Sequence, residues 1–539
     1  MDSVIALAER FEVPPFRYRW AVTTNLTLFW LRFVAFYAVL ANIPYWAASR
    51  AFGFVPLGWF CVEYALVGLI ALVVPRFVSG ILLLVTIFVD LLCGVCQSYY
   101  LPVRECLANL GSAHNFSAPR LLGTVAVVLL ALLVAANTFL LPGKTLPRVH
   151  RLRAAAALTT ICILVFFTDV LSVYFSTGHL PGALVKLRGL DSINLSLSKL
   201  PRFARFPVLR LAQNVENDAS IRAMEKSGEA SAFAVPSATA LAVRSAGILP
   251  GGINRESPNL VLVLVESWGL PQDSALKQAL VEPYAQTDLL TKYDVIQGTV
   301  PFYGPTIGAE ARELCGSGFS FHVLIATTSE LKGCLPARLA AIGYETVAMH
   351  GMTGRMFDRA NWYRTIGFKE RWFNEQLKPA GLHDCMGAFV GTCDADIAAL
   401  IGQRLRDQTP QPYFIHWMTL SSHLPVLVPS PLANGSPCLA ALSLAPKSAL
   451  CSWYQLVTNV HQSVAQVALG NLARPTVFVI VGDHAPPFGD PSLRSRFSQS
   501  DVPYVVLLPR SYESHANSLL ARSAADVAPG TAKSSRQTP

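Results

Sequence analysis

The chain has 539 residues, of which 52% are hydrophobic and only 14% are charged, and its mean hydropathy is +0.41. Globular proteins carry about 25% charged residues, so this composition excludes a disordered chain, a coiled coil and an ordinary cytosolic enzyme. The net charge of +9 is explained by membrane topology and one basic segment, and we expect no nucleic-acid partner.

Five apolar blocks fill the chain between residues 26 and 177. They are Leu26–Ala48, Phe52–Pro75, Phe77–Pro102, Leu121–Pro142 and Ala154–Thr177. Each reaches the roughly 20 residues that a helix needs to cross a bilayer. The first block is not a cleavable signal, because it is too long and further apolar blocks follow. We therefore predict a membrane α-helical bundle of five transmembrane helices over residues 26–177.

Basic residues favour a cytoplasmic N-terminus, residues 1–25. With this orientation the inner segments carry eight Arg and Lys residues, and the outer segments carry three. The positive-inside rule therefore predicts that, after five crossings, the chain beyond Thr177 lies outside the cytoplasmic membrane.

Charged residues inside a membrane are costly and mark candidate functional sites. Here they are Arg32, Glu63, Asp90 and Asp169. A pairing of Glu63 or Asp90 with Arg32 and a contact with lipid headgroups both remain open. Cys93 and Cys96 have Cys-x-x-Cys spacing, but they lie in the third block, and we interpret them as membrane packing.

Residues 178–257 form a predicted interfacial and linker segment. Between Lys186 and Gln213, bulky apolar residues alternate with Lys199, Arg202, Arg205 and Arg210. Such a pattern suits a segment lying on anionic lipid, and a plain basic linker is the alternative. At the other end of the chain, the Ser- and Ala-rich residues 510–539 are predicted to be disordered.

Residues 258–509 show short β-branched runs that alternate with amphipathic stretches, which predicts an α/β domain. Six of the 11 cysteines fall there, and an even number outside the membrane indicates disulfides. Proximity favours the pairs Cys315–Cys334, Cys385–Cys393 and Cys438–Cys451. A zinc site built from these thiols is the alternative, but this half contains no Cys-x-x-Cys.

Ionisable side chains follow four apolar runs of this domain. They are Glu266 after residues 259–265, His350 after 345–349, His423 after 413–420, and Asp483 with His484 after 476–481. The carboxyl ends of strands form the ligand-binding edge of an open α/β sheet, so we expect these side chains to meet. The mixed carboxylate and imidazole set of Glu266, Asp483 and His484 suits one divalent metal ion, Zn²⁺ or Mn²⁺.

Thr306 is the candidate nucleophile. Pro and Gly residues around it indicate a loop, and residues 309–314 indicate a helix, which places Thr306 at the helix N-terminus. A Thr there is ordinarily a cap, but the free N–H groups of a helix start also favour a phosphate. A hydroxyl beside a divalent ion loses its proton more readily and becomes a nucleophile.

Glu266, Thr306 and Asp483-His484 together resemble the lipoteichoic acid synthase and phosphoethanolamine transferase group. This group belongs to the sulfatase-like branch of the alkaline phosphatase superfamily. The resemblance covers residues 258–509 and the layout of five membrane helices before an outer catalytic domain. It implies an α/β alkaline-phosphatase-like (sulfatase-like) domain in which Glu266, Thr306, Asp483 and His484 bind the metal. It also implies that Thr306 takes a phosphoryl headgroup from a phospholipid and passes it to an acceptor.

The resemblance further implies substrate-binding roles for His350, Arg359 and His423. For Arg359, pairing with Asp358 or Glu370 is the structural alternative. The phosphoethanolamine transferases usually have another His about a dozen residues after the Asp-His pair, and residues 485–496 contain none. The outer cysteines, in contrast, resemble that branch, so both headgroups stay open.

Cys334 and Arg338 fit the Cys-x-Pro-x-Arg pattern of sulfatases, in which the Cys matures to formylglycine. We reject this site because residues 335–344 read as a helix running into the strand that ends at His350. Cys334 also has an expected disulfide partner, and Thr306 already occupies the nucleophile's place.

We therefore expect a multi-pass protein of the bacterial inner (cytoplasmic) membrane with its catalytic domain on the periplasmic or extracellular side. The enzyme would move phosphoglycerol or phosphoethanolamine from a membrane phospholipid donor to an envelope glycan or glycolipid acceptor. A phosphate- or sulfate-ester hydrolase of the same superfamily is the alternative. A non-enzymatic envelope organiser is a third hypothesis, and the oligomeric state is not indicated by the sequence.

Overall fold

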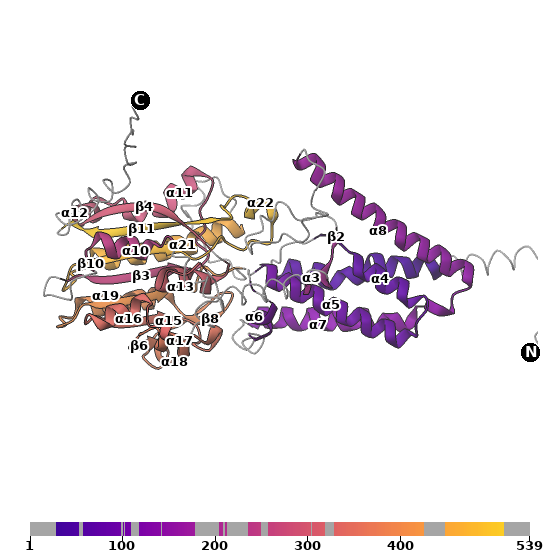
Figure 1. The fold of residues 1–539 in the computed structure, drawn as a ribbon, viewed down its shortest axis with the longest axis horizontal. Helices are drawn as coiled ribbons and strands as arrows, with labels where there is room; N and C mark the ends of the chain where they lie inside the picture. The colour runs from indigo at the N-terminus through magenta and orange to yellow at the C-terminus, as the bar shows by residue number, and fades with distance from the viewer. Residues whose placement is uncertain are drawn as a thin grey trace, which may run out of the picture. The chain divides into compact units, whose positions relative to one another are not determined.

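The computed structural model describes residues 29–52, 58–98, 101, 103–108, 118–141, 143–177, 204–208, 211–212, 235–248, 257–302, 304–318, 328–424 and 448–510. The chain divides into two compact units (Figure 1). The first consists chiefly of residues 1–107 and 118–219, and the second of residues 220–488 and 492–539. The predicted N-terminal segment, most of the predicted linker and the predicted disordered tail lie outside the described residues.

The first unit is built from apolar helices. Four of them are long and apolar enough to cross a membrane: Phe29–Phe52, Arg76–Cys96, Arg120–Thr145 and Arg148–Asp169. The second predicted block instead contains α4 (Val62–Ala71), whose 10 residues are too few to cross a bilayer core. The predicted helical membrane bundle is therefore confirmed, with four helices of spanning length in the described part of the chain rather than five.

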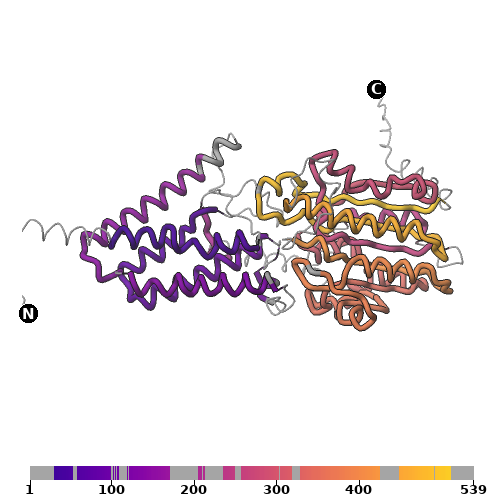
Figure 2. Tube along the Cα trace, turned by 180° about the vertical axis from the view of Figure 1, so that it is seen from behind, coloured from indigo at the N-terminus to yellow at the C-terminus, as the bar shows by residue number. Residues whose placement is uncertain are grey.

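Besides α4, this unit contains several further helical elements. They are η1 (Leu40–Asn42), α3 (Ile43–Phe52), α5 (Arg76–Ser98), α6 (Val103–Ala108), α7 (Ala118–Ala136), η3 (Asn137–Leu140), η4 (Gly143–Thr145) and α8 (Arg148–Thr177). Figures 1 and 2 both show α8 diverging from the other helices of this unit toward its C-terminal end. Phe33, Tyr37, Tyr64, Leu83 and Leu158 are fully or almost fully buried in one apolar cluster of the unit.

A buried ion pair lies among the helices of the first unit. The Nη2 atom of Arg205 is 2.7 Å from Oδ2 of Asp90, and each side chain is only 1% exposed. Arg205 also donates to the carbonyl of Gly58 and lies 3.9 Å from the centroid of the Tyr45 ring. A pairing of Asp90 with Arg32, one of the alternatives that the sequence left open, is therefore not found, because Asp90 is paired with a residue that follows the last apolar block.

The other two intramembrane carboxylates hold the same short segment. Asp169 accepts a hydrogen bond from the backbone N–H of Ala204, at 2.8 Å, and Glu63 accepts one from that of Val208, at 3.0 Å. Strand β1 (Phe60–Cys61) also pairs in parallel with β2 (Ala204–Arg205). Residues 204–208 are thus docked on the helices, and Arg205 does not lie on anionic lipid as one interpretation of this segment predicted.

The second unit contains a seven-stranded sheet with strand order β4-β11-β10-β3-β9-β5-β6. The strands are β3 (Asn259–Val265), β4 (Tyr293–Pro301), β5 (Glu345–His350), β6 (Glu370–Trp372), β9 (Tyr413–Met418), β10 (Thr476–Gly482) and β11 (Asp501–Pro509). Strand β3 is parallel to β9 and β10, whereas β11 is antiparallel to β10 and β4. Figure 1 shows β4, β11, β10 and β3 side by side in that order. The predicted α/β domain is confirmed.

The central strands explain the uninterrupted apolar runs of the sequence. Every residue of β3 and of β10 is buried, which is typical of parallel strands covered by helices on both faces. The helices are α10 (Ala238–Ser245), α11 (Ser274–Val281), η9 (Glu282–Tyr284), α12 (Thr287–Lys292), α13 (Thr306–Cys315), α15 (Thr328–Leu331), α16 (Leu335–Ala341), η10 (Met356–Asp358), α17 (Arg359–Thr365), α18 (Asn374–Leu377), α19 (Asp394–Arg406), α21 (Ala449–Leu469) and α22 (Pro491–Arg494). A separate two-stranded sheet pairs β7 (Asp384–Met386) with β8 (Val390–Thr392).

Two of the predicted disulfides, Cys315–Cys334 and Cys385–Cys393, are present in the second unit. Cys451 is also disulfide-bonded, and its predicted partner Cys438 lies outside the described residues. Cys334 is therefore not a free thiol that matures to formylglycine, which agrees with the rejection of the sulfatase motif.

Candidate active site

Four neighbouring strands deliver the predicted site residues to one edge of the sheet. Strands β10, β3, β9 and β5 are consecutive in the strand order and parallel to one another. Glu266 directly follows β3, Asp483 and His484 follow β10, and His350 is the last residue of β5. His423 lies in the turn after β9. The same turn is tied to the end of β3, because the backbone N–H of Glu266 donates to Oγ1 of Thr419. The convergence that the sequence predicted is thus a consequence of parallel strand order.

Glu266, Asp483 and His484 form a buried group with ligand atoms within 4.8 Å of one another. The Nε2 atom of His484 is 3.2 Å from Oδ2 of Asp483 and 3.7 Å from Oε1 of Glu266. The Nδ1 atom of His484 lies 3.0 Å from the carbonyl of Ala485, and a bond donated there leaves the lone pair on Nε2, facing the two carboxylates.

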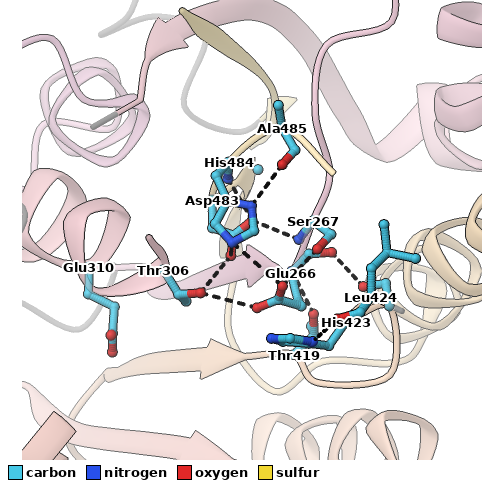
Figure 3. Close-up of polar contacts among 12 residues, drawn as sticks. Glu266, Ser267, Thr306, Glu310, Thr419, His423, Leu424, Asp483, His484 and Ala485 are labelled. Carbon is cyan, nitrogen blue, oxygen red and sulfur yellow. Dashed lines mark hydrogen bonds and ion pairs between the residues drawn. The ribbon is translucent and has the colours of Figure 1, made fainter. Parts of the chain in front are cut away.

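Thr306 directs its hydroxyl into this group (Figure 3). Its Oγ1 atom donates to Oε2 of Glu266 at 3.2 Å and to Oδ2 of Asp483 at 3.0 Å. Pro305 is the N-cap of α13, and Thr306 is the first helical residue. The hydroxyl therefore does not cap the helix, which was the structural alternative for this residue.

Burial makes the two carboxylates reluctant to ionise, and the charge of Asp483 adds to this effect at Glu266. Burial, together with the charge of Asp483, raises the pKa of Glu266 to about 8, and burial raises the pKa of Asp483 to about 6. Burial also lowers the pKa of His484, which keeps its imidazole neutral. Two buried carboxylates and a neutral imidazole at one point are a donor set that fits a divalent cation.

Ser267 supports both carboxylates, and the sequence analysis gave it no role. Its backbone N–H donates to Oδ1 of Asp483 at 2.7 Å, and its Oγ donates to Oε1 of Glu266 at 2.8 Å. The carbonyl of Ser267 accepts a bond from Nε1 of Trp453 at 2.8 Å. Ser267 has a φ of 58°, an uncommon conformation for a residue other than Gly. The sequence signal was its place directly after Glu266.

Arg312 ties the helix that carries Thr306 to the strand that carries Asp483. This fully buried side chain donates to the carbonyls of Gly482 at 2.9 Å and Pro301 at 3.0 Å. At Gly482 a Cβ atom would lie only 1.9 Å from the carbonyl oxygen of Trp268, so the close approach of these two turns requires glycine.

His350 and His423 are held through their Nδ1 atoms. His350 is buried, and its Nδ1 lies 3.0 Å from the carbonyl of Met418. Burial and the charge of Arg359 lower the pKa of His350 well below its usual value. His423 is half-buried, its Nδ1 lies 2.7 Å from the carbonyl of Leu424, and its ring packs edge-to-face on Phe389. A bond donated by Nδ1 leaves each Nε2 as an acceptor.

Arg359 is buried, and its partner is neither Asp358 nor Glu370. Its Nη2 atom lies 2.9 Å from Oε2 of Glu310, and its Nε bonds both oxygens of the same carboxylate. Glu310 also accepts a short hydrogen bond from the hydroxyl of Tyr363. The structural alternative for Arg359, a pairing with Asp358 or Glu370, is therefore not found. Glu310 lies one helical turn after Thr306 in the Gly-Ala-Glu segment, which was the only signal for its importance.

Comparison with solved structures finds, among others, three bacterial proteins with low similarity to this chain. The chain is 15% identical to the lipoteichoic acid synthase LtaP from Listeria monocytogenes, with a TM-score of 0.35, over 50% of this chain and 72% of that one. It is 13% identical to the Streptococcus pyogenes phosphoglycerol transferase GacH in complex with sn-glycerol-1-phosphate, with a TM-score of 0.31 over 50% and 73%. It is 14% identical to the C-terminal periplasmic domain of EcEptC from Escherichia coli in complex with Zn, with a TM-score of 0.32, over 49% of this chain and 78% of that one.

The sequence itself was compared with curated proteins and with family models. No curated protein matches it. The model of the sulfatase family matches residues 258–533, about half of the chain, and this match begins where the predicted catalytic domain begins. The chain therefore belongs to the sulfatase family.

Proposed function

We propose that this protein is a membrane-anchored, metal-dependent transferase of phospho-alcohol headgroups. It moves phosphoglycerol or phosphoethanolamine from a phospholipid to an envelope glycan or glycolipid, through a phosphorylated Thr306. The observation that carries the proposal is the Thr306 hydroxyl, which lies within 3.2 Å of two buried carboxylates at the start of a helix. A hydroxyl in that place has an activating site on one side and free backbone N–H groups for a phosphate on the other.

The proposed metal site consists of Glu266, Thr306, Asp483 and His484, with Zn²⁺ or Mn²⁺ as the ion. When bound, a divalent ion lowers the pKa of a neighbouring hydroxyl and offsets charge on phosphoryl oxygens. The residues of the chain hold this geometry without the ion, since Ser267 bonds to both carboxylates and Ala485 orients His484. Such outer contacts orient the ligands of a metal site.

The reaction has two displacement steps at phosphorus. In the first, Oγ1 of Thr306 forms a bond to phosphorus, the bond from phosphorus to the diacylglycerol oxygen breaks, and the proton of Thr306 ends on that oxygen. In the second, an acceptor hydroxyl bonds to phosphorus, and its proton returns to Oγ1 as the bond from phosphorus to Thr306 breaks. Both steps use the same position of the phosphoryl group, which fits a site fixed on rigid strand ends.

His350, His423 and Arg359 form the proposed headgroup subsite. Each imidazole donates through Nδ1 to a backbone carbonyl, so its Nε2 offers an acceptor atom to a headgroup hydroxyl or ammonium. The charge of Arg359 is already paired with Glu310, so we assign Arg359 to holding the subsite in shape.

The donor and the anchor share the membrane. Helices long and apolar enough to span a bilayer confine the enzyme to the two-dimensional phase that contains phospholipids. The disulfides of the second unit favour an oxidising compartment, which supports a periplasmic or extracellular catalytic domain independently of the number of crossings.

Mass spectrometry of the full-length protein tests the proposal. The protein is reconstituted with metal in vesicles that contain phosphatidylglycerol or phosphatidylethanolamine, and the peptide that contains Thr306 is then weighed. We expect that peptide to gain the mass of one phosphoglycerol or phosphoethanolamine group. Thr306→Ala should abolish the adduct and lower turnover at least about a thousandfold. Thr291→Ala, at an exposed position on α12, is the matched control and should leave both unchanged.

The same experiment separates transfer from hydrolysis. With a glycan or glycolipid extract of the envelope as acceptor, a transferase yields labelled glycan or glycolipid. Release of free phospho-alcohol alone, with and without the extract, would sink the transferase proposal and establish a hydrolase. Full turnover by Thr306→Ala would contradict the assignment of Thr306 as the nucleophile.

A further inference from the structure

Two thiols in the first unit lie in direct contact. Sγ of Cys96, near the end of α5, is 2.9 Å from Sγ of Cys106 in α6. Both side chains are buried, with exposures of 1% and 6%. The sequence analysis noticed Cys96 only for its spacing from Cys93, and the proposed function uses none of these residues.

The surroundings of the two thiols are apolar. Cys96 and Cys106 belong to a small cluster with Leu92 and Val103, against which Leu211 packs. Among the described residues, the only group of three or more metal-ligating side chains is the one at Glu266, so the pair is not part of a recognisable metal site. A contact between two sulfur atoms in an apolar environment suits a covalent bond between them.

The same end of the first unit receives the chain that leads to the second unit. Sγ of Cys93 donates to the carbonyl of Pro207, and Leu211 lies against the cysteine cluster. From there the chain continues to the catalytic unit, which carries the disulfides Cys315–Cys334 and Cys385–Cys393. Disulfides persist in oxidising compartments. Cys96 and Cys106 thus lie beside the part of the chain, at Pro207 and Leu211, that leads on to the disulfide-bonded unit.

We propose that Cys96 and Cys106 form a disulfide that cross-links α6 to α5. The oxidant is the disulfide of an exported thiol–disulfide oxidoreductase. One thiolate of the pair attacks a sulfur of that disulfide, forming a mixed disulfide and releasing the first thiolate of the oxidoreductase. The second thiolate then attacks the cysteine sulfur of the mixed disulfide, and the second thiolate of the oxidoreductase leaves. The new Cys96–Cys106 bond forms, the two electrons pass to the oxidant, and the protons of both thiols end on its two sulfur atoms. Oxidation precedes burial, because the folded cluster leaves little room for a partner protein.

The disulfide would strengthen the surface that Pro207 and Leu211 contact. It closes the chain between α5 and α6 and holds Cys106 and Val103 in place against Leu211. A cross-link of this kind reduces the freedom of the unfolded chain. The disulfide therefore adds a covalent element to the ionic anchor that Asp90 and Arg205 provide for residues 204–208.

Differential alkylation of the full-length protein tests this proposal, and it does not depend on catalytic activity. The protein is expressed in a bacterial inner membrane, denatured in N-ethylmaleimide, digested without reduction and examined by mass spectrometry. We expect a cross-linked peptide pair containing Cys96 and Cys106, two hydrogens lighter than the sum of its parts. Cys162, a half-buried free thiol of α8, is the internal control and should be alkylated.

Two results would overturn the proposal. One is N-ethylmaleimide on both Cys96 and Cys106, and the other is a cross-link from either of them to Cys93. Melting in detergent gives a second readout. Cys96→Ser should lower the melting temperature by several degrees. A reductant should lower the melting temperature of the parent protein more than that of the variant, because the variant lacks the Cys96–Cys106 bond. Cys162→Ser should have the melting temperature of the parent protein. An equal decrease in both variants would contradict a stabilising disulfide between Cys96 and Cys106.

Discussion

Glu310 and Arg359 form a bidentate ion pair one helical turn from the candidate nucleophile. The side chains are 0% and 2% exposed. Burial alone lowers the pKa of Arg359, but the charge of Glu310 reverses this effect and leaves the pKa raised. The arginine that the family resemblance assigned to the headgroup is therefore charged, yet it is already paired within the fold.

Removal of Glu310 should destabilise the protein strongly. Glu310→Ala leaves the guanidinium of Arg359 buried without its carboxylate, and breaking such a pair costs about 3–5 kcal/mol. We expect the melting temperature of the purified full-length protein to fall by roughly 10 °C. Glu345→Ala removes the partner of Lys369 in an exposed pair, which is worth at most about 1 kcal/mol, and serves as the control. Equal losses in the two variants would contradict the importance assigned to the buried pair.

Ser267→Ala should weaken metal binding while the protein remains folded. The variant loses the hydroxyl that donates to Glu266, whereas the backbone bond to Asp483 remains. Loss of one such supporting contact typically lowers metal affinity about 10- to 100-fold. Competition with a chromogenic chelator measures this change, and Ser463→Ala is the control, because the hydroxyl of this half-buried residue bonds to the carbonyl of Asn459 within α21. An unchanged affinity would show that Ser267 does not support the site.

Metal affinity should rise with pH between about 6 and 8. Asp483 and Glu266 have pKa values of about 6 and about 8 in the metal-free site, and protons compete with a cation for the same oxygens. The stability of the metal-free folded state changes with pH in the opposite direction. The folded state keeps the proton of Glu266 while the unfolded chain loses it above the ordinary value of 4.5, so stability falls as pH rises from about 4.5 to about 8.

Calorimetric titration and melting across this pH range measure both trends. Glu266→Gln removes the higher of the two titrations, and the metal-free variant should lose the decline in stability above about pH 6. A metal affinity that is constant from pH 6 to pH 8 would contradict the assignment of these carboxylates as ligands.

Arg205→Ala should destabilise the membrane unit. It removes the partner of Asp90 and leaves that carboxylate buried, at a cost of about 3–5 kcal/mol. We expect earlier melting in detergent, and trypsin should cleave the chain faster on the N-terminal side of Val208, at Arg202. Arg32→Ala is the matched control, because Arg32 is exposed and lies over the ring of Phe29. Identical melting of the two variants would show that the buried pair does not anchor the segment.

The sequence by itself determined the division of the chain and the composition of the candidate site. Apolar length separates a membrane part from an α/β part, because a bilayer and a sheet core demand runs of different lengths. Glu266, His350, Asp483 and His484 were found because each follows an apolar strand, and parallel strands end at one edge. The short-range disulfides followed from proximity in the chain.

The tertiary structure alone decided which charges are paired. Asp90 is 115 residues from Arg205, and Glu310 is 49 residues from Arg359. No local periodicity connects residues so far apart in the chain. The sequence therefore suggested Arg32 as a partner for Asp90, and Asp358 or Glu370 as a partner for Arg359, and the structure shows neither pairing. Burial determines the outcome, because a charge removed from water requires an opposite charge in contact wherever the fold brings one. The same holds for Cys96 and Cys106, whose contact depends on how α6 packs against α5.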